Sequence, residues 1–524
     1  MFRYNQQKDI SSSWWRRVGV VSMLLISLFV LAGCGSSDAP KGKILHYGTT
    51  AYGPAMENAG LNPHVSYQGW SAVRYGVGET LVRFTETMEV APWLADSWQM
   101  IDDHTVRFHI RDGVIFSNGK PLTAELVKTN LEELVREHDR APKDLKLEAI
   151  TVEGPYITIQ SANPVTVLLT FLADPYSAIV DLSDGAPNGL VVGTGPFKAT
   201  KVSETGVSLV RNDSYWGGAP KLDGVEVLRI TDGDTLTMAL QKGDIEVAQG
   251  LPYSSLNLFS DTQAFSISSA ATSRVYQVAF NFMSPAVQDK RVREAVASAI
   301  DKGQFASVLL NGYGVPAVGP FPSTTKLGQM ELIGPRYDEA KAKALLAEAG
   351  YRDTDGDGYV DKGGQPLTIR WLTYTSRQEL PLLAESAQAT LKKIGIKVVV
   401  NATDAYQSVL KQGDFDVFAK AFVTAPTGDG TYYFKTNILS EAVDNVGQYK
   451  SPQIEHLMAD LEATVAPEAR HSLLQQMVQQ VLADEAVIYV AHLKMNLVMT
   501  EKVINFKAYP TDYYEITKDV DIEP

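Results

Sequence analysis

The spacing of hydrophobic and polar residues predicts short strands and amphipathic helices that alternate along the chain. Apolar and polar residues alternate from Val106 to Arg111, as in a strand with one buried face. The apolar segment Ile44–Gly48 predicts an earlier strand. Asp338 is placed to cap a predicted helix over 339–349, and Gly350 ends that helix. The pattern continues without internal repeats and predicts α/β lobes.

Two local signals add detail between these elements. Thr123 is a predicted N-cap for a helix whose apolar side includes Leu126 and Leu131. The turn dipeptides Asp112-Gly113 and Asn118-Gly119 bound a short segment that we predict to be a strand.

The N-terminal segment has the pattern of an export signal. A basic leader precedes an apolar run from Val18 to Val30, about 13 residues, which is shorter than the ~20 residues that span a bilayer. The run ends in Leu31-Ala32-Gly33-Cys34, which resembles the bacterial lipobox. We therefore predict a signal peptide at 1–33, lipidation of Cys34, and an anchor and tether at 34–43. The alternative is a cysteine that is discarded with the leader.

Composition excludes several classes of function. The formal net charge of −14 argues against nucleic acid as a partner, because phosphate binding needs a basic surface. Cys34 is the one cysteine, so neither an internal disulfide nor a site with several thiolate ligands is expected. No later stretch is long and apolar enough to predict a membrane span.

Local motifs favour a binding protein over an enzyme. The 8 histidines are scattered, and the sequence has no His-Glu-x-x-His motif, nucleophile elbow or P-loop. The acidic segment Asp353–Asp361 resembles a calcium loop, but Gly364 stands where the bidentate glutamate of an EF-hand would be. We favour a solvated turn there, and we expect no catalytic residues, no resident metal and no cofactor.

A set of ordered phrases resembles one family closely, the large peptide- and nickel-binding proteins of ABC importers, extracellular solute-binding family 5. The phrases cover nearly the whole chain after the leader, in the family's order and spacing: Glu79–Val82, Ala91–Trp98, Phe108–Leu122, Gly193–Phe197, Arg211–Gly217 and Asp289–Val296. Most of them are interpreted as architecture, with the glycines serving tight turns or close packing.

The resemblance implies an α/β fold, a two-lobed periplasmic-binding-protein clamshell of the type II-like, large class. Lobe I would contain residues 44–268 and 498–524, with an inserted subdomain at roughly 85–190. Lobe II would contain residues 269–497. The ligand would be trapped between the lobes as they close.

Comparison with the nickel-chelate receptors of the family implies part of a site. Ser71 matches a methionine that packs near the metal in those receptors, with Trp70 beside it and Tyr67 nearby. Arg140 falls on an arginine that grips a carboxylate, for which a guanidinium is suited. Asp174 stands where those receptors hold a second arginine, although an aspartate before proline also fits a turn cap. The metal-binding histidine of those receptors has no counterpart between Thr431 and Gln448.

Comparison with the peptide receptors implies the rest of the site. Their Gly-Asp-type loop matches the segment with Thr427 and Asp429, where an aspartate can hold a ligand's ammonium group. The alternative for Asp429 is a plain turn. Tyr406 and Tyr513 are further candidates for the wall of the pocket.

The sequence therefore predicts a receptor that is lipid-anchored to a bacterial membrane, faces the periplasm or cell exterior, and delivers a ligand to ABC permease subunits. The ligand is predicted to be a small peptide or an amino-acid-like compound, with a nickel or other metal chelate as the alternative. A membrane-tethered sensor without transport is the alternative from another class. We expect a monomer.

Overall fold

The computed structural model of the protein describes residues 42–51, 60–181, 183 and 187–523. Residues Lys43–Pro524 make up one unit by their contacts. The predicted signal peptide, Cys34 and nearly all of the predicted tether lie outside the described residues. In the described ranges, no helix is both long and apolar enough to cross a bilayer.

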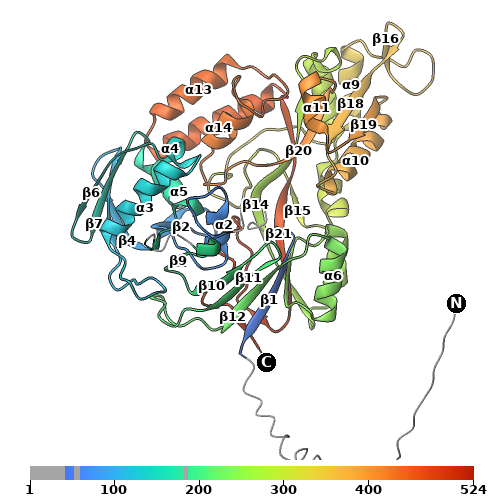
Figure 1. The fold of residues 1–524 in the computed structure, drawn as a ribbon. Coiled ribbons are helices and arrows are strands. Elements are labelled where there is room, and N and C mark those ends of the chain that lie inside the picture. The colour runs from blue at the N-terminus through green and yellow to red at the C-terminus, as the bar shows by residue number, and fades with distance from the viewer. Residues whose placement is uncertain (1–41, 52–59, 182, 184–186, 524) are drawn as a thin grey trace, which may run out of the picture. The chain divides into compact units, whose positions relative to one another are not determined.

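One long sheet runs through the unit and connects segments from both halves of the sequence (Figure 1). Its order is β10-β11-β12-β1-β13-β21-β14-β20-β18-β19, and β15 pairs with β21 off this path. The strands are β1 Ile44–Thr49, β10 Phe197–Val202, β11 Gly206–Arg211, β12 Gly224–Arg229, β13 Val247–Gln249, β14 Phe265–Phe280, β15 Gly314–Pro316, β18 Thr368–Thr373, β19 Lys397–Ala402, β20 Val417–Val423 and β21 Val487–Thr500. The strand that the sequence predicts at 44–48 is confirmed as β1.

The antiparallel strands β14 and β21 are the longest of this sheet, with 16 and 14 residues, and their pairing joins its two halves. On one side, β21 pairs with β13 and so with the strands around β1. On the other, β14 pairs with β20 and so with β18 and β19. The lobe boundaries predicted at 268 and 498 fall inside these two strands, and that division stays a prediction.

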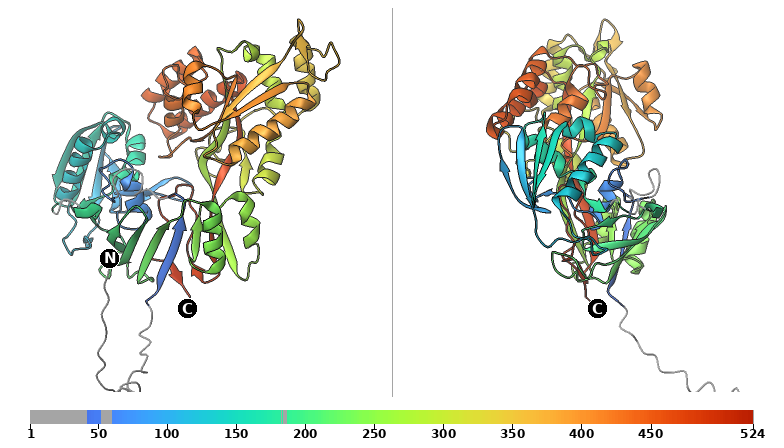
Figure 2. Two further views of the ribbon diagram at one scale, coloured as in Figure 1. Left: turned by 45° about the vertical axis from the view of Figure 1, so that its right-hand side comes forward. Right: turned by 60° about the vertical axis from the view of Figure 1, so that its left-hand side comes forward.

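A smaller four-stranded sheet, β4-β5-β7-β6, lies apart from the long one in Figure 1 and in the left view of Figure 2. Its strands are β4 Ala95–Met100, β5 Thr105–Ile110, β6 Leu147–Glu153 and β7 Tyr156–Ser161, and it packs with α3 Ala124–Glu137. The alternation predicted at 106–111 is confirmed, because Val106, Phe108 and Ile110 are buried. Thr123 caps α3 as predicted.

The segment expected to be a strand at 114–117 is not one. Only Ile115 pairs, in an isolated bridge with Pro121. The segment lies between two turns in which Gly113 and Gly119 have positive φ angles of 77° and 87°, and this leaves too little extended chain for a ladder.

Helices cover the half of the long sheet that contains β18. They are α7 Lys290–Ser298, α9 Glu339–Glu348, α10 Glu379–Lys393 and the short α11 Tyr406–Gln412. Asp338 caps α9 as predicted, by accepting from the Lys341 N–H. The fully buried Trp371 of β18 lies in the hydrophobic core that α7, α9 and α10 share with the sheet, whereas α11 packs in a separate small cluster with Phe418.

Other helices complete the unit. They are α2 Gln68–Arg74, α4 Ala141–Leu145, α5 Val165–Leu172, α6 Gly233–Lys242, α13 Pro452–Ala463 and α14 Pro467–Ala483. The antiparallel pair α13 and α14 lies at the top of Figure 1 and packs into a core of its own, which includes Tyr433 and Met477.

Three of the phrases that carry the family resemblance meet at one buried carboxylate. Glu79 accepts hydrogen bonds from the Thr194 hydroxyl at 2.8 Å, the Tyr215 hydroxyl at 2.7 Å and the Trp216 indole N–H at 2.7 Å. Burial raises the pKa of Glu79 to about 7 even though these donors lower it. Gly193 packs so tightly against this segment that a Cβ would lie 1.9 Å from the Val77 carbonyl oxygen. These motifs are therefore architectural, as the sequence indicates.

Candidate ligand-binding cleft

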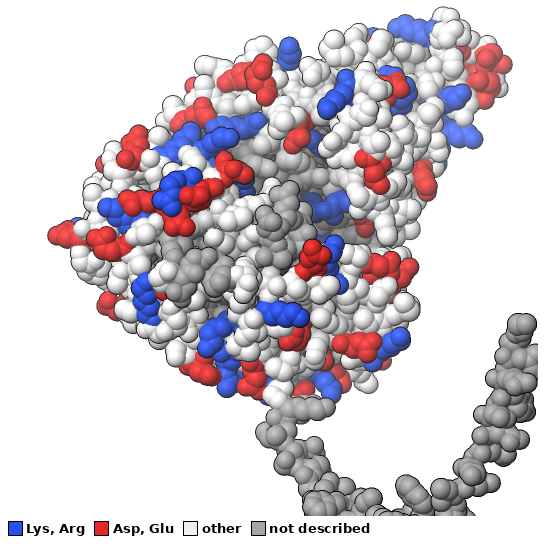
Figure 3. All heavy atoms as spheres, in the orientation of Figure 1, with Lys and Arg blue, Asp and Glu red and all other residues white. Residues whose placement is uncertain are grey.

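A cleft of about 660 Å³ lies beside the paired strands β14 and β21, in the middle of the long sheet. Its walls come from the middle of β14, the loop before α10, β21, the loop after β13 and the C-terminal segment at 510–513. Segments from across the sequence thus face one space. Figure 3 shows this face of the molecule hollowed, with Lys and Arg side chains in the hollow.

Two arginines line the cleft. Arg274 lies on β14 where its register with β21 shifts between Ala271 and Val275, and Arg377 lies in the loop before α10. Both are half-buried. In the part of the chain that the structure describes, no hydrogen bond or ion pair reaches either guanidinium. The pKa of Arg274 is lowered, first by burial and then by the positive charge of Arg377.

Two carboxylates also line the cleft. Glu379 accepts from the Tyr276 hydroxyl at 2.8 Å, and Asp512 accepts from the Trp70 indole N–H at 2.9 Å. Among the described residues, neither carboxylate has a cationic partner within ion-pair distance. The cleft therefore presents both positive and negative groups, and its cations and anions do not neutralise one another in pairs.

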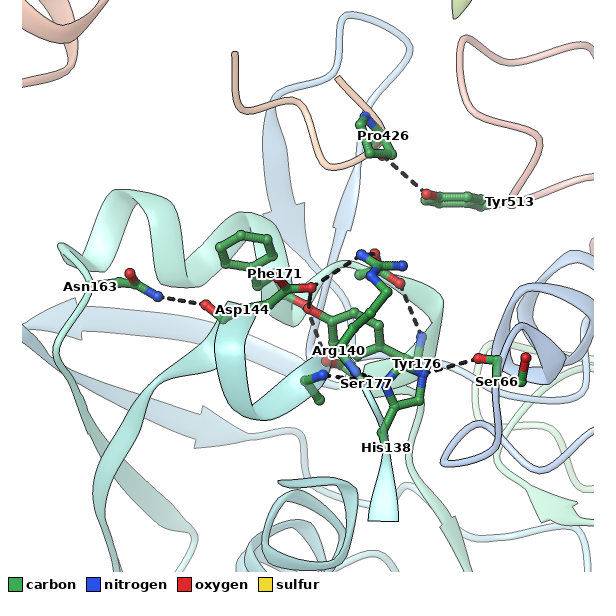
Figure 4. Close-up of polar contacts among 12 residues, drawn as sticks. Ser66, His138, Arg140, Asp144, Asn163, Phe171, Tyr176, Ser177, Pro426 and Tyr513 are labelled. Carbon is green, nitrogen blue, oxygen red and sulfur yellow. Dashed lines mark hydrogen bonds and ion pairs between the residues drawn. The ribbon is translucent and has the colours of Figure 1, made fainter. Parts of the chain in front are cut away.

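The predicted residues Arg140 and Asp174 pair with each other, with the Arg140 guanidinium 3.4 Å from the Asp174 carboxylate. Figure 4 shows Arg140 beside Asp144 and Tyr176: its guanidinium lies 3.1 Å from the Asp144 carboxylate and over the ring of Tyr176. Asp174 also accepts from the Tyr176 backbone N–H and so caps the turn at Pro175–Ser177. Burial raises the pKa of Asp174 and Arg140 opposes this rise. Asp174 thus caps the turn, as one of the two alternatives had it, and pairs with Arg140, while a ligand role for it stays a prediction.

In the loop predicted to hold an ammonium group, the aspartate also has partners within the protein. Asp429 accepts from the Thr431 N–H at 2.8 Å and lies 3.5 Å from the Arg470 guanidinium, with both side chains buried. Thr427 is buried, and its hydroxyl has no partner among the described residues. The Tyr513 hydroxyl donates to the Pro426 carbonyl at 3.0 Å, and Tyr513 is the predicted residue that lines the cleft.

The other predicted residues lie around this region or away from it. The Trp70 indole N–H donates to Asp512, which lines the cleft. The Trp70 ring also lies against Arg74, with its centroid 4.6 Å from the guanidinium carbon. Ser71 is fully buried within α2, whereas Tyr67 is 61% exposed at the start of that helix. Tyr406 stacks on Phe418 with ring centroids 5.6 Å apart, in a separate small cluster. A ligand role for this set stays a prediction.

Sequence reasoning missed Arg274, Arg377, Glu379 and Asp512. Arg377 had a usable signal, because it follows the carboxyl end of β18, which is parallel to β19 and β20, and ligands bind beyond such strand ends in α/β sheets. Arg274 had none, because the irregularity that exposes it depends on strand pairing with β21.

Metal-binding groups are few in the described ranges. The carboxylates that gather there are Asp353, Asp355 and Asp357, all exposed. They belong to the predicted calcium-like turn, and acidic turns of this kind are common without an ion.

The α/β clamshell and its central cleft define a solute receptor. Residues 89–442 match the family "Bacterial extracellular solute-binding proteins, family 5 Middle", and the chain belongs to this family of ABC-importer receptors. The predicted family and fold class are thereby confirmed.

Alignments to named binding proteins cover nearly the whole chain. The chain is 27% identical over 506 residues to nickel-binding protein NikA of Staphylococcus aureus, covering 96% of this chain and 99% of NikA. It is 25% identical over 539 residues to oligopeptide-binding protein AppA of Bacillus subtilis, covering 95% and 97%. Among solved structures, a nickel ABC transporter protein from Bacillus halodurans has a TM-score of 0.79 at 28% identity, covering 92% of this chain and all 100% of that one. The family thus includes receptors for both predicted classes of ligand.

Proposed function

We propose that this protein is a membrane-anchored receptor outside the cytoplasm that captures a small peptide or amino-acid-like ligand and delivers it to an ABC permease. The observation that carries this proposal is the cleft of about 660 Å³, whose walls include Gln249 of β13 on one side of the β14–β21 pair and Val423 of β20 on the other. Its volume is within the usual range for small-molecule sites. Its mixture of charged and aromatic groups suits a zwitterionic ligand.

Capture would work through a shift between open and closed arrangements of the lobes. Arg274 lies on β14, one of the strands that join the lobes, Arg377 precedes α10, and Asp512 belongs to the C-terminal segment. A ligand that contacts all three gains its full set of interactions only when these segments approach one another. Ligand binding therefore favours the closed form, which is the form that a permease would recognise.

A metal-chelate receptor is the second candidate, and similarity to nickel-binding proteins over most of the chain favours it. Residues 431–448 contain no histidine, and none occurs among the described residues of the cleft walls. A metal would therefore be held mainly by its chelator. The chain's part would be to bind the chelator's charged groups.

The anchor and the oligomeric state complete the proposal. We infer lipidation of Cys34 from the sequence pattern at 31–34, and a monomer that works with permease subunits. The family consists of binding receptors, and this supports a binding function over catalysis.

Native mass spectrometry of the purified protein, together with metal analysis, tests the proposal. We expect a co-purified ladder of small peptide masses and a metal content well below one per chain. A stoichiometric metal with an organic chelator would replace the first candidate by the second. Turnover of an added peptide, in place of simple binding, would contradict a receptor.

A further inference from the structure

The predicted lobes also meet at two turns that lie outside the paired strands β14 and β21. The turn of lobe I, at residues 85–89, connects the short strands β2 Val82–Phe84 and β3 Val90–Pro92. It meets residues 321–328 of lobe II, where the Lys326 backbone N–H donates to the Thr87 carbonyl at 3.4 Å. The Lys326 ammonium also lies 3.5 Å from the Glu89 carboxylate. Contact between the lobes therefore does not depend on the long strands alone.

Met88 makes the apolar part of this contact. It lines a gap of about 10 Å³ together with apolar residues of lobe II: Phe321, Pro322, Leu327 and Ala425. A gap of this size is near the smallest that could hold one water. A Cβ added at Gly428 of lobe II would lie 3.7 Å from Met88 Cε, so the end of the methionine packs against that lobe.

The backbone of the lobe I turn holds Met88 in a strained conformation. Its φ angle is 64°, in the left-handed region that residues other than glycine avoid. The Met88 N–H donates to the Thr85 carbonyl at 3.0 Å, and the Thr85 hydroxyl accepts from the Glu89 N–H at 3.1 Å. Strain of this kind persists where the surrounding structure enforces it, and it is found at switch regions. The turn thus presents Met88 to lobe II in a fixed direction.

The turn of lobe II is fixed as well. The Thr325 hydroxyl donates to the Pro322 carbonyl at 2.8 Å, and a Cβ at Gly328 would lie 2.0 Å from that carbonyl oxygen. The carbonyls at 329, 331 and 333 are hydrogen-bonded by side chains one turn apart on α14: His471, Gln475 and Gln479. Both turns are therefore formed within their own lobes, and little conformational entropy is lost when they meet.

A third contact lies beside these turns. The Tyr513 hydroxyl of the C-terminal segment donates to the Pro426 carbonyl of lobe II at 3.0 Å (Figure 4). The apolar gap around Met88 and the cleft share Ser273 and Pro510 in their walls. The contact between the turns therefore closes the molecule directly beside the cleft.

We propose that the turn at 85–89 is a latch that holds the two lobes closed before a ligand arrives. The proposal rests on the proposed function, because it takes capture to require closure, and it adds a contact that needs no ligand. With the latch made, the closed form is the majority of the ligand-free protein. The apparent affinity for a ligand then rises in proportion to the closed fraction. Because the polar part of the latch is one long hydrogen bond and one exposed ion pair, it still opens to admit a ligand.

Two spin labels measure the closed fraction without any ligand. Cys34 is the one cysteine, so a Cys34→Ser background leaves no other thiol. The labels are attached through Glu153→Cys in lobe I and Ile333→Cys in lobe II, where the native side chains are 84% and 82% exposed. Pulsed electron double resonance gives the distribution of distances between them. With the native latch, we expect one main distance that matches the structure, in which the latch is made.

Met88→Gly is the variant that opens the latch. It removes the side chain from lobe II and relieves the backbone strain, because glycine adopts a positive φ readily. We expect it to remain folded and to move most of the distribution away from the closed distance. Gln448→Gly is the matched control, since Gln448 is exposed, has a φ of 56° and lies outside both turns. It should keep the closed distance.

Two further variants test the contact from its other sides. Leu327→Ala enlarges the recess in lobe II, and it should open the protein but add nothing to Met88→Gly, because both act on one contact. Glu89→Gln removes the ion pair and should give a smaller shift. Its control is Glu86→Gln, because Glu86 is exposed in the same turn and has no ion pair with a described residue. If Met88→Gly melts well below Gln448→Gly, Leu327→Ala takes its place.

Calorimetric titration then measures what the latch contributes to capture. The probes are an equimolar dipeptide mixture and nickel(II) with L-histidine, which represent the two ligand classes of the proposed function. We expect Met88→Gly to weaken binding of the probe that wild type binds by roughly 3- to 10-fold, because the closed fraction falls. Gln448→Gly and Glu86→Gln should bind as wild type does. Tyr513 is left unchanged, since it also lines the cleft.

The outcomes separate the latch from the proposed function. A ligand-free protein whose main distance differs from that of the structure would overturn the latch. Equal distance distributions for Met88→Gly and Gln448→Gly would also overturn it, as would an opened Met88→Gly that binds its probe with unchanged affinity. Wild type that binds neither probe would count against the proposed function. The spin-label distances would still decide whether the turn at 85–89 holds the lobes closed.

Discussion

The surroundings of Arg140 and the cleft around Arg274 place similar residues in opposite situations. Arg140 has two carboxylates within 3.4 Å, and one of them, Asp174, is buried and also caps a turn. Arg274 and Arg377 share the cleft with the carboxylates of Glu379 and Asp512, but neither guanidinium has an ion-pair partner among the described residues. Residue type and family position therefore do not make an arginine available to a ligand. What matters is whether the fold has already supplied its counter-charge.

Among the acidic and basic groups whose partners lie within the fold, Glu79 is expected to have the largest effect on the free energy of unfolding. Its pKa is raised by burial from an ordinary 4.5 to about 7, so between these pH values the native state holds a proton that the unfolded chain has released. The contribution of Glu79 to the free energy of unfolding therefore falls by about 3 kcal/mol as the pH rises from about 5 to 8. Glu79→Gln cannot ionise, and we expect its unfolding free energy to lose this part of the pH dependence.

Urea denaturation at a series of pH values measures the Glu79 effect as the difference between wild type and variant. Glu153→Gln is the control, because the Glu153 side chain is 84% exposed. If Glu79→Gln and Glu153→Gln follow the same pH profile, the buried carboxylate is ionised throughout and the prediction fails.

Arg140 and Arg377 then allow a direct test of the comparison. Arg140→Gln leaves Asp174 buried without its cation, and we expect a loss of about 2 kcal/mol, reduced from the value for a fully buried pair because the Arg140 side chain is 38% exposed. Arg377→Gln should leave the free energy of unfolding unchanged. Adding Asp174→Asn to Arg140→Gln should recover part of the loss. Equal losses for the two arginine variants in urea denaturation would remove the distinction between the regions.

Much of the fold was predictable, because its signals are local. Thr123 and Asp338 cap helices where the sequence places them, and the alternation at 106–111 gives a strand with one buried face. The strand predicted at 114–117 failed because glycine turns on both sides leave it too short. Local patterns thus fix helix ends and strand faces, but they do not show whether a short extended segment finds a partner.

The site was less predictable, because its contacts join distant segments. The bond from Trp70 to Asp512 spans 442 positions, and the position of Arg274 depends on β21. The family resemblance found Arg140 and Asp174 as separate candidates but could not show that they are each other's partners. Pairing of charges is a property of the fold, and no residue pattern along the chain records it.

Asp429 and Asp512 repeat the comparison on the acidic side. Asp429→Asn removes the carboxylate that faces Arg470, and we expect it to cost about 1 kcal/mol of stability with little change in ligand binding. Asp512→Asn should leave stability nearly unchanged and weaken binding of the dipeptide mixture roughly 10-fold, since Asp512 accepts from Trp70 but has no ion-pair partner among the described residues and can still bind an ammonium group. Calorimetric titration and urea denaturation of both variants check this, and an exchange of the two effects would contradict it.

Trp70→Phe gives the smallest expected effect and asks how a predicted residue takes part in the site. The indole N–H donates to Asp512, while its ring lies over Arg74, whose guanidinium is held by Glu515. Phenylalanine keeps an aromatic face over Arg74 and loses the donor, so we expect stability to fall by less than about 1 kcal/mol. Binding of the dipeptide mixture should weaken roughly 3-fold, because Asp512 is less firmly oriented. In an Asp512→Asn background the same substitution should have no further effect on binding. A persistent effect there would mean that Trp70 contacts the ligand directly, as the predicted ligand role of Trp70 requires.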